Sequence, residues 1–424
     1  MDTSNNVVKI VYDNSDDKFV VDLIKHELDW RLYDYGEHLE NYRLLTTKQL
    51  LISDIKNFCR FVQSFFCCPQ SSGKNRVLSF LPNLDDLLRK NGYTPYSYIY
   101  FRKTAHSIHS LKLFYFKFKV DRVIRRHDFN RMLSNTDIKF INSYIDFLKE
   151  LIIKYDFKAL IVTTDEFFYQ RSAIAAFQLL GRPTISFTHG LPGNYVMESD
   201  TRADYILTWG NAIRQNYIKI GLNPSKIHVV GNPKYQTSFK DITIHWDDKN
   251  ILVIPESAFE YHQHTYSQPH FPDRSRMIAY LYEVQYVLME LGYKKARFRP
   301  HPSLNWNWFL KYVDMGFYEI DKKNLVESIR MTSMIIGATS SVFLEYMKEG
   351  KNYIVYERPR TCSDYPLVPP FNGHDKRIPF ASTPDQLMEL MRRKPIVDPS
   401  VFDDYIQGFD KEKLLSLMKE ATCK

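Results

Sequence analysis

Two stretches decide the fold of this chain: KKARFRPHPS at residues 294–303 and SMIIGATSSVFLEYMKEGKNYIVYE at residues 333–357. In the first, a short strand runs into two prolines, which end regular pairing and leave Arg299 and His301 at the strand's carboxyl end. In the second, an apolar strand is followed by a turn of small residues, a helix and another apolar strand. This order of elements is typical of a parallel α/β sheet.

The turn between that strand and that helix, Gly337 to Ser341, is rich in hydroxyl groups. Hydroxyls and backbone N–H groups at a helix start favour an anion, and the helix dipole adds to the attraction. Each motif also has an ordinary structural interpretation, because Arg-Pro-His-Pro forms a rigid turn and Thr-Ser-Ser caps a helix. Both motifs directly follow a strand, and this position, with their order along the chain, favours a phosphate site. The residues assigned to it are Arg299, His301, Thr339, Ser340 and Ser341.

Apolar strands also alternate with helices of about ten residues between residues 155 and 235, which predicts a parallel, doubly wound sheet. Ligands of such sheets bind at the carboxyl ends of the strands. Glu256 is expected at that edge of a second sheet. The polar residues expected at that edge of the first sheet are Asp165, Glu166, His189, Asn232 and Lys234.

The predicted fold class is therefore α/β, with two Rossmann-like parallel-sheet domains facing a cleft. Residues 1–240 are expected to form the first domain, and residues 241–395 the second, which carries the phosphate site. The polar, irregular stretch at 236–249 has the composition of a linker. Residues 396–424 are expected to form a helical tail that packs back on the N-terminal domain.

The composition is that of a globular protein, with 44% hydrophobic and 25% charged residues among 424. The net charge of +8 is modest. The most basic region, residues 102–131, fits either a solvated helix face or a basic, aromatic surface that meets an acidic polymer or a membrane. No nucleic-acid-binding motif is present, so a nucleic-acid partner is not expected.

The five cysteines match no zinc-binding spacing, and no apolar run approaches the roughly 20 residues of a membrane span. We therefore expect a cytoplasmic protein whose membrane contact is at most peripheral, on the inner face of the cytoplasmic membrane. No cofactor and no metal ion are expected, since the chain has no clear Asp-x-Asp metal motif.

Several motifs together resemble the bacterial surface-polysaccharide glycosyltransferases of the GT-B fold. They are THG, ADYILTWG, KIHVVGNPKY, RPHPS and GATSSVFLEYMKEGK, within residues 155–360. The resemblance is strongest to enzymes with cytidine-nucleotide donors, namely the HP-motif sialyltransferases and the Kdo transferases of capsule and O-antigen synthesis. The teichoic-acid polyol-phosphate transferases are similar. The first 150 residues resemble no family, as is usual for an acceptor-binding domain. The resemblance implies that residues 1–240 form the acceptor-side domain and residues 241–395 the domain that binds the nucleotide donor.

The resemblance implies roles for individual residues. His301 matches the HP-motif histidine, which contacts the donor phosphate, and Ser340 and Ser341 match the hydroxyl pair that binds it. Asp165 and Glu166 lie where the sialyltransferase-like enzymes carry an acidic motif that supplies the catalytic carboxylate. Here phenylalanine rather than glycine follows the acidic pair. The identity of the catalytic base therefore stays open between Asp165, Glu166 and Glu256.

The leading functional hypothesis is a glycosyltransferase that moves an acidic sugar, Kdo or sialic acid in type, from a CMP-activated donor to a growing capsule or lipopolysaccharide O-antigen glycan. Its partners would be the nucleotide-sugar donor and a glycan or lipid-linked glycan acceptor. One alternative is a CDP-polyol phosphotransferase of the teichoic-acid type. Another is a UDP-sugar enzyme, in which Glu345 would hold the ribose hydroxyls. An alternative of a different class is a non-catalytic binding module.

Overall fold

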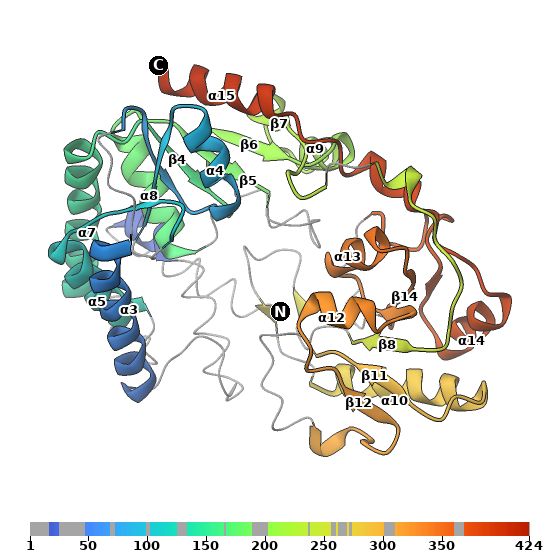
Figure 1. Ribbon diagram of the computed structural model, residues 1–424. Coiled ribbons are helices and arrows are strands. Elements are labelled where there is room, and N and C mark those ends of the chain that lie inside the picture. The colour runs from blue at the N-terminus through green and yellow to red at the C-terminus, as the bar shows by residue number, and fades with distance from the viewer. Residues whose placement is uncertain are drawn as a thin grey trace.

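The fold is that of a computed structural model, shown in Figure 1. The structure describes residues 17–24, 47–67, 73–98, 102–124, 134–164, 167–188, 202–235, 238–255, 260–261, 269–270, 274–300, 310–359 and 369–423. Within these ranges, no helix combines the length and the apolar character needed to cross a membrane.

The N-terminal domain is built on a sheet of seven parallel strands in the order β3-β2-β1-β4-β5-β6-β7. Its strands are β1 Arg76–Ser79, β2 Thr94–Ser97, β3 His106–Ser107, β4 Ala159–Val162, β5 Thr184–Phe187, β6 Tyr205–Thr208 and β7 Ile227–Val229. Its helices are α3 Thr47–Cys67, α4 Pro82–Lys90, α5 Leu111–Ile124, α7 Asn135–Lys154, α8 Phe168–Leu179 and α9 Asn211–Lys219, with a 3-10 turn, η2, at Pro224–Lys226. The central strands β1, β4 and β5 are almost fully buried, as their continuous apolar runs predict.

The C-terminal domain is built on six parallel strands in the order β12-β11-β8-β13-β14-β15. Its strands are β8 Ile251–Ile254, β11 Ala296–Phe298, β12 Tyr318–Ile320, β13 Met334–Gly337, β14 Asn352–Tyr356 and β15 Phe380–Ala381. Its helices are α10 Arg274–Glu290, α12 Leu325–Arg330, α13 Val342–Lys348 and α14 Pro384–Arg393, with 3-10 turns η3 Phe239–Asp241, η4 Leu310–Tyr312 and η5 Pro399–Asp404. Two short strands, β9 Glu260–Tyr261 and β10 Pro269–His270, pair with each other in antiparallel fashion.

Two α/β units, each with an all-parallel sheet, confirm the predicted fold class of two Rossmann-like domains, as in the GT-B architecture. The sequence pattern predicts helices at 342–348 and 384–393, and α13 and α14 begin and end at those residues. It predicts only a spacer between 303 and 333, whereas the structure has β12 and α12 there. It also predicts a strand at residues 7–12, which lie outside the described residues.

The two sheets are joined by one continuous apolar cluster rather than by a bare linker. The rings of Trp209 and Tyr235 lie 5.9 Å apart, and those of Tyr235 and Phe239 5.7 Å apart. Phe402 continues the row, at 5.7 Å from Phe239 and 5.3 Å from Phe343 of α13. All five belong to the same buried cluster, so the stretch expected to be a plain linker carries buried contacts.

After η5 the chain returns to the N-terminal domain and ends in helix α15, Lys411–Cys423, which lies beside β6 and β7 (Figure 1). The Gln407 amide donates to the Trp209 carbonyl, and the Asp410 amide donates to the Val230 carbonyl, each at 2.8 Å. Gly231 has a φ of +75°, and a Cβ there would lie 2.4 Å from the carbonyl oxygen of Gly408. Only glycine therefore permits this close crossing of two backbones.

Candidate functional site

The two motifs singled out in the sequence meet at the carboxyl end of strand β8. On one side, the Arg299 amide donates to the Val253 carbonyl at 2.9 Å. On the other side, the Ala338 amide donates to the Ile254 carbonyl at 3.0 Å. Because β11 and β13 both pair with β8, the end of the basic strand and the hydroxyl-rich turn flank the same point of the sheet.

The turn itself is held from below by Glu357, which follows β14. The Thr339 amide donates to Glu357 Oε1 at 2.6 Å, and the Glu357 side chain is buried. Thr339 Oγ1 is also buried and has no hydrogen-bond partner among the described residues. Ser340 Oγ accepts from the Val342 amide at 3.3 Å, whereas Ser341 makes no side-chain capping bond. The turn therefore keeps two hydroxyls, on Thr339 and Ser341, that the start of the helix does not use.

A tyrosine beneath the turn fixes its path. The Tyr353 hydroxyl donates to the Ala338 carbonyl at 2.8 Å, and burial raises the pKa of this phenol well above its usual range. A Cβ at Gly337 would lie 2.1 Å from that hydroxyl oxygen. Glycine is needed here because the tyrosine passes directly against the strand's exit.

The positive charge at the end of β11 comes from two arginines that share one carboxylate. Asp321 Oδ2 lies 3.3 Å from Arg299 Nη1 and 3.0 Å from Arg297 Nη2. Ser328 Oγ also donates to that carboxylate, and Arg299 Nη1 donates to the Lys323 carbonyl at 2.8 Å. Two guanidinium groups against one carboxylate leave an excess of one positive charge at the end of β11.

The protonation of Asp321 follows from the same contacts. Burial acts to raise its pKa, but the hydrogen bonds from Ser328 and from the Lys323 amide, with the two guanidinium groups, hold that pKa below its usual range. Asp321 is therefore ionised wherever the protein is folded near neutral pH. Its charge keeps Arg297 and Arg299 in place at the strand's end.

Lys234 and Glu345 join the two domains beside the turn. Glu345 lies on α13, and its Oε1 is 2.5 Å from Lys234 Nζ and accepts from the Tyr235 hydroxyl at 2.6 Å. Only 16% of the Glu345 side chain is exposed. The sequence offered Glu345 as the ribose ligand of a UDP-sugar enzyme, and in the structure its partners place it at the domain junction.

Asn232 forms the turn that presents Lys234. Its Oδ1 accepts from the Lys234 amide at 2.9 Å, and its carbonyl accepts from the Tyr235 amide at 3.0 Å. The Asn232 side chain therefore shapes the loop after β7, at the carboxyl edge of the first sheet. Both residues lie at the sheet edge where the sequence places them.

Five predicted site residues lie outside the described residues: Asp165, Glu166, His189, Glu256 and His301. Their roles stay predictions. The described part brings together Arg299 with Thr339, Ser340 and Ser341 around β8, and sets Lys234 against the helix that follows this turn.

Three supporting residues were missed by sequence reasoning: Asp321, Glu357 and Tyr353. Asp321 and Glu357 each come directly after a strand, where an acidic side chain is a recognisable signal. For Tyr353 the only signal is a glycine in the neighbouring strand, and the pairing of that strand is not visible in the sequence. Among the described residues, no three His, Cys, Asp or Glu side chains are grouped so as to hold a metal ion.

Comparison with known proteins gives a likeness only at the level of structure. No family model matches the chain, and no curated protein matches it. A putative UDP-N-acetylglucosamine 2-epimerase from Listeria monocytogenes is 14% identical, with a TM-score of 0.47 over 82% of this chain and 96% of that one. A glycosyltransferase from Rickettsia africae is 11% identical, with a TM-score of 0.47 over 82% and 98%. The wall teichoic acid polymerase TagF, as its H444N variant, is 10% identical, with a TM-score of 0.41 over 88% and 96%.

Proposed function

We propose that this chain is a glycosyltransferase that moves an acidic sugar, Kdo or sialic acid in type, from a CMP-linked donor to a growing bacterial surface glycan. The observation that supports it most is the convergence of Arg299 and the 338–341 turn on the end of strand β8. A nucleotide bound at the carboxyl edge of a parallel sheet would place its phosphate at this point.

The proposed site would stabilise the leaving phosphate without a metal ion. The excess positive charge on the Arg297, Arg299 and Asp321 group would attract the phosphate, and the hydroxyls of Thr339 and Ser341 would donate to its oxygens. The buried Thr339 hydroxyl supports this role, because a hydroxyl left without a partner costs free energy unless a ligand supplies one. His301 would complete the cradle. Such donors accelerate transfer when they bind the charge that develops on the leaving group.

The acceptor hydroxyl would be activated by a carboxylate from the edge of the first sheet. Strand β4 ends at Val162, so Asp165 and Glu166 follow it by three and four residues. Glu166 is our preferred base, because its longer side chain reaches further, and Glu256 is the reserve. His189, Asn232 and Lys234 would surround the donor sugar from the same edge. The acceptor would be a glycan or a lipid-linked glycan in the cytoplasm.

A second candidate, a UDP-sugar enzyme, is favoured by one observation. Glu345 is a mostly buried carboxylate on the helix that starts at the phosphate turn. A carboxylate in that position would hold ribose hydroxyls if Lys234 and Tyr235 released it. A CDP-polyol phosphotransferase would use the same phosphate cradle but would transfer to phosphorus instead of carbon.

Thermal melting with a panel of CMP, CDP, UDP and GDP tests the proposal. A ligand present at a hundred times its dissociation constant adds about 2.7 kcal/mol of stability, which raises the melting temperature by several degrees. We expect CMP and CDP to stabilise the protein more than UDP or GDP. A preference for UDP would favour the second candidate, and a melting temperature unmoved by every nucleotide would contradict both.

A further inference from the structure

Helix α3 buries three polar residues and leaves most of its apolar residues exposed. Asp54, Asn57 and Ser64 are 9%, 8% and 3% exposed, which is unusual for such side chains. The outward side carries a stripe at helical spacing that we call the α3 face. It consists of Leu51, Ile52, Ile55, Phe58, Val62, Phe65 and Phe66, all exposed, with Phe66 at 84%.

The contacts on the inner side fix this orientation. Asp54 Oδ2 pairs with Arg122 Nη2 of α5 at 2.7 Å, and the Ser64 hydroxyl donates to the Phe61 carbonyl at 2.6 Å. The ring of Phe61 packs at 5.9 Å from that of Phe114 on α5. An ion pair and aromatic packing thus hold this side of α3 against α5.

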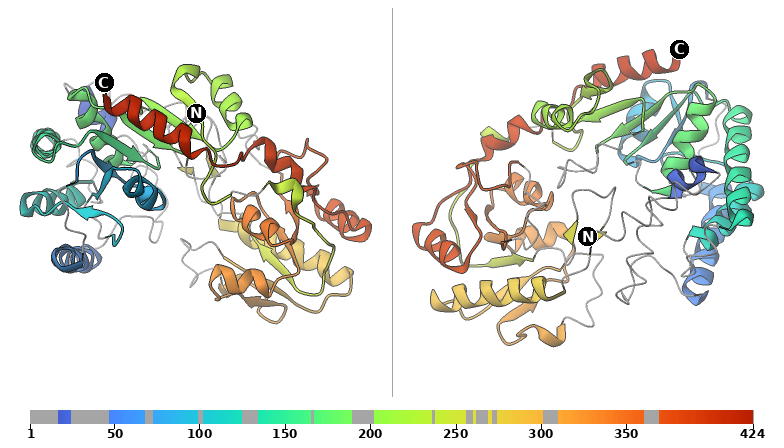
Figure 2. Two further views of the ribbon diagram at one scale, coloured as in Figure 1. Left: turned by 45° about the horizontal axis from the view of Figure 1, so that its top comes forward. Right: turned by 180° about the vertical axis from the view of Figure 1, so that it is seen from behind.

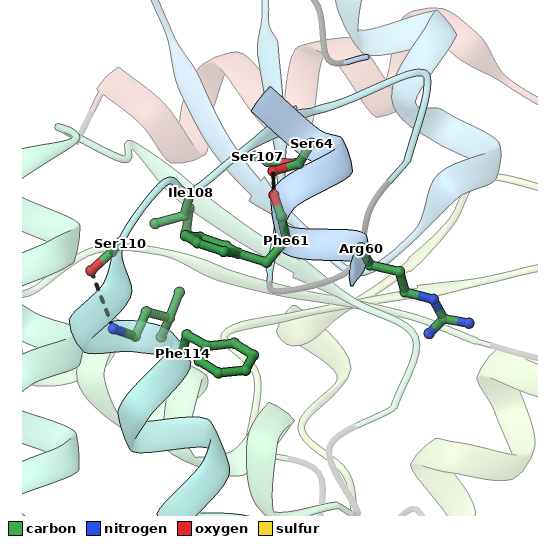
Figure 3. A pocket seen from close by; sticks show the side chains of 8 residues that line it. Arg60, Phe61, Ser64, Ser107, Ile108, Ser110 and Phe114 are labelled. Atoms are coloured by element: carbon green, nitrogen blue, oxygen red, sulfur yellow. Dashed lines mark hydrogen bonds between the residues drawn. The ribbon is translucent and has the colours of Figure 1, made fainter. Parts of the chain in front are cut away.

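The seam between the two helices is incompletely filled. A small pocket of ≈ 20 Å³ lies there, lined by residues of α3, of the end of β3 and of the start of α5. Figure 3 shows Phe61, Ile108 and Phe114 among its walls, with the Arg60 side chain directed away from them. The pocket and the α3 face belong to the same helix pair, at the end of the N-terminal domain remote from α15 (Figures 1 and 2).

The exposed charges of helix α3 itself are of one sign. Lys48, Lys56 and Arg60 are exposed on α3, and the only acidic residue of this helix is the buried Asp54. The neighbouring α5 adds the exposed Leu111, Tyr115 and Lys119. An exposed apolar patch of this kind marks a binding surface, and cations beside it select an anionic partner.

We propose that the α3 face binds the surface of an anionic lipid bilayer. An amphipathic helix with aromatic and aliphatic residues on one side and flanking cations lies in the plane of the lipid headgroups. A second copy of the chain fits the charges less well, because a two-fold interface would bring each set of lysines and arginines against itself. The sequence places the basic, aromatic surface at residues 102–131. Helix α5 lies in that stretch and buries most of its apolar residues and Lys117, so we assign the membrane-binding surface to α3 instead.

Vesicle flotation of the full-length protein tests this inference without any donor or acceptor, so its failure would leave the proposed reaction untouched. We expect binding to vesicles of phosphatidylcholine with phosphatidylglycerol, little binding to phosphatidylcholine alone, and weaker binding as salt rises. The charge reversal Lys56→Glu with Arg60→Glu should reduce binding about tenfold or more. A matched reversal on α15, Lys411→Glu with Lys419→Glu, should not.

A second pair of variants separates the apolar contribution. Ile55→Ser with Val62→Ser should abolish flotation while leaving the melting temperature unchanged, because both side chains are exposed. Leu179→Ser with Ile396→Ser changes two other exposed apolar residues and should float as the wild type does. Wild-type flotation by both α3 variants would overturn the inference. So would a concentration-dependent dimer that the Ile55→Ser, Val62→Ser variant loses, in a protein that binds no vesicles.

Discussion

The hydroxyl of Tyr353 and the carbonyl of Ala338 are joined by a 2.8 Å hydrogen bond that ties strand β14 to the first residue after β13, in the 338–341 turn proposed to bind phosphate. Both residues are buried, and the bond passes directly under Gly337. The position of the turn therefore depends on a side chain from the next strand of the sheet. Mutations beneath the turn should affect nucleotide binding without touching the nucleotide.

Gly337→Ala tests this dependence. The added methyl group would lie 2.1 Å from the Tyr353 hydroxyl oxygen, so either the tyrosine or the turn must move. We expect a loss of about 1–3 kcal/mol in the free energy of unfolding, together with weaker nucleotide affinity. Gly408→Ala is the control, since a Cβ there meets no atom within 4 Å. Equal stability of the two variants in urea unfolding would show that the turn tolerates the displacement.

His301→Ala should weaken transfer and leave the fold intact. If His301 contacts the donor phosphate, loss of that contact should lower turnover about a hundredfold or more. Steady-state kinetics with the nucleotide-sugar donor measures this effect, and circular dichroism checks the fold. Wild-type transfer rates would remove the residue from the site.

The two serines of the turn separate binding from helix capping. In Ser340→Ala the Val342 amide loses its acceptor, so about 1 kcal/mol of stability should be lost as well as affinity. Ser341 makes no capping bond, so Ser341→Ala should lower nucleotide affinity with little change in melting. Calorimetric titration and thermal melting on both variants and on the double variant measure the two effects. Stability losses with unchanged affinity would show that the pair only caps the helix.

The catalytic carboxylate is tested with Asp165→Asn, Glu166→Gln and Glu256→Gln, which keep the shape and remove the charge. Adjacent residues of an extended strand end point to opposite sides, so only one of Asp165 and Glu166 should reach the sugar. We expect Glu166→Gln to bind donor normally and to lose several orders of magnitude in transfer. Near wild-type transfer by all three variants would contradict the proposed mechanism.

Asp321 predicts a stability effect with a defined pH dependence. Its pKa is lowered in the folded protein, so its charge stabilises the fold above the unfolded-state pKa. That contribution is lost as the pH falls from about 4 through the lower folded-state pKa. Asp321→Asn should therefore be less stable than wild type at pH 7, and the difference should shrink at pH 3. Urea unfolding of both proteins at pH 7 and pH 3 measures this difference in the free energy of unfolding. The same difference at both pH values would show that the charge of Asp321 plays no part.

The sequence predicted much of the C-terminal sheet because the apolar strands β8, β13 and β14 are buried on both faces and stand out as continuous runs. Strand β12 and helix α12 escaped prediction because they have three and six residues, too few for a period to show. The contact of Glu345 with Lys234 and Tyr235 was not predictable, since it joins residues more than a hundred positions apart.

Helix α3 shows a different limit of prediction from the sequence. Its apolar stripe has the spacing of a core-facing helix, and that pattern alone predicts burial of the stripe. In the structure this side faces outward, while Asp54 on the opposite side pairs with Arg122 of the neighbouring α5. Periodicity predicts that a helix has an apolar and a polar face. It does not predict which face packs against the rest of the protein, because that also depends on the partners of the polar residues.

The return of the chain from the C-terminal to the N-terminal domain has a consequence for synthesis. Buried residues of α15, among them Leu414 and Met418, share one cluster with β6, β7 and the row of rings at the junction. All seven strands of the first sheet have therefore been synthesised before the ribosome begins the second domain. The edge of that sheet beside β7 stays uncovered until residues 411–423 have been synthesised.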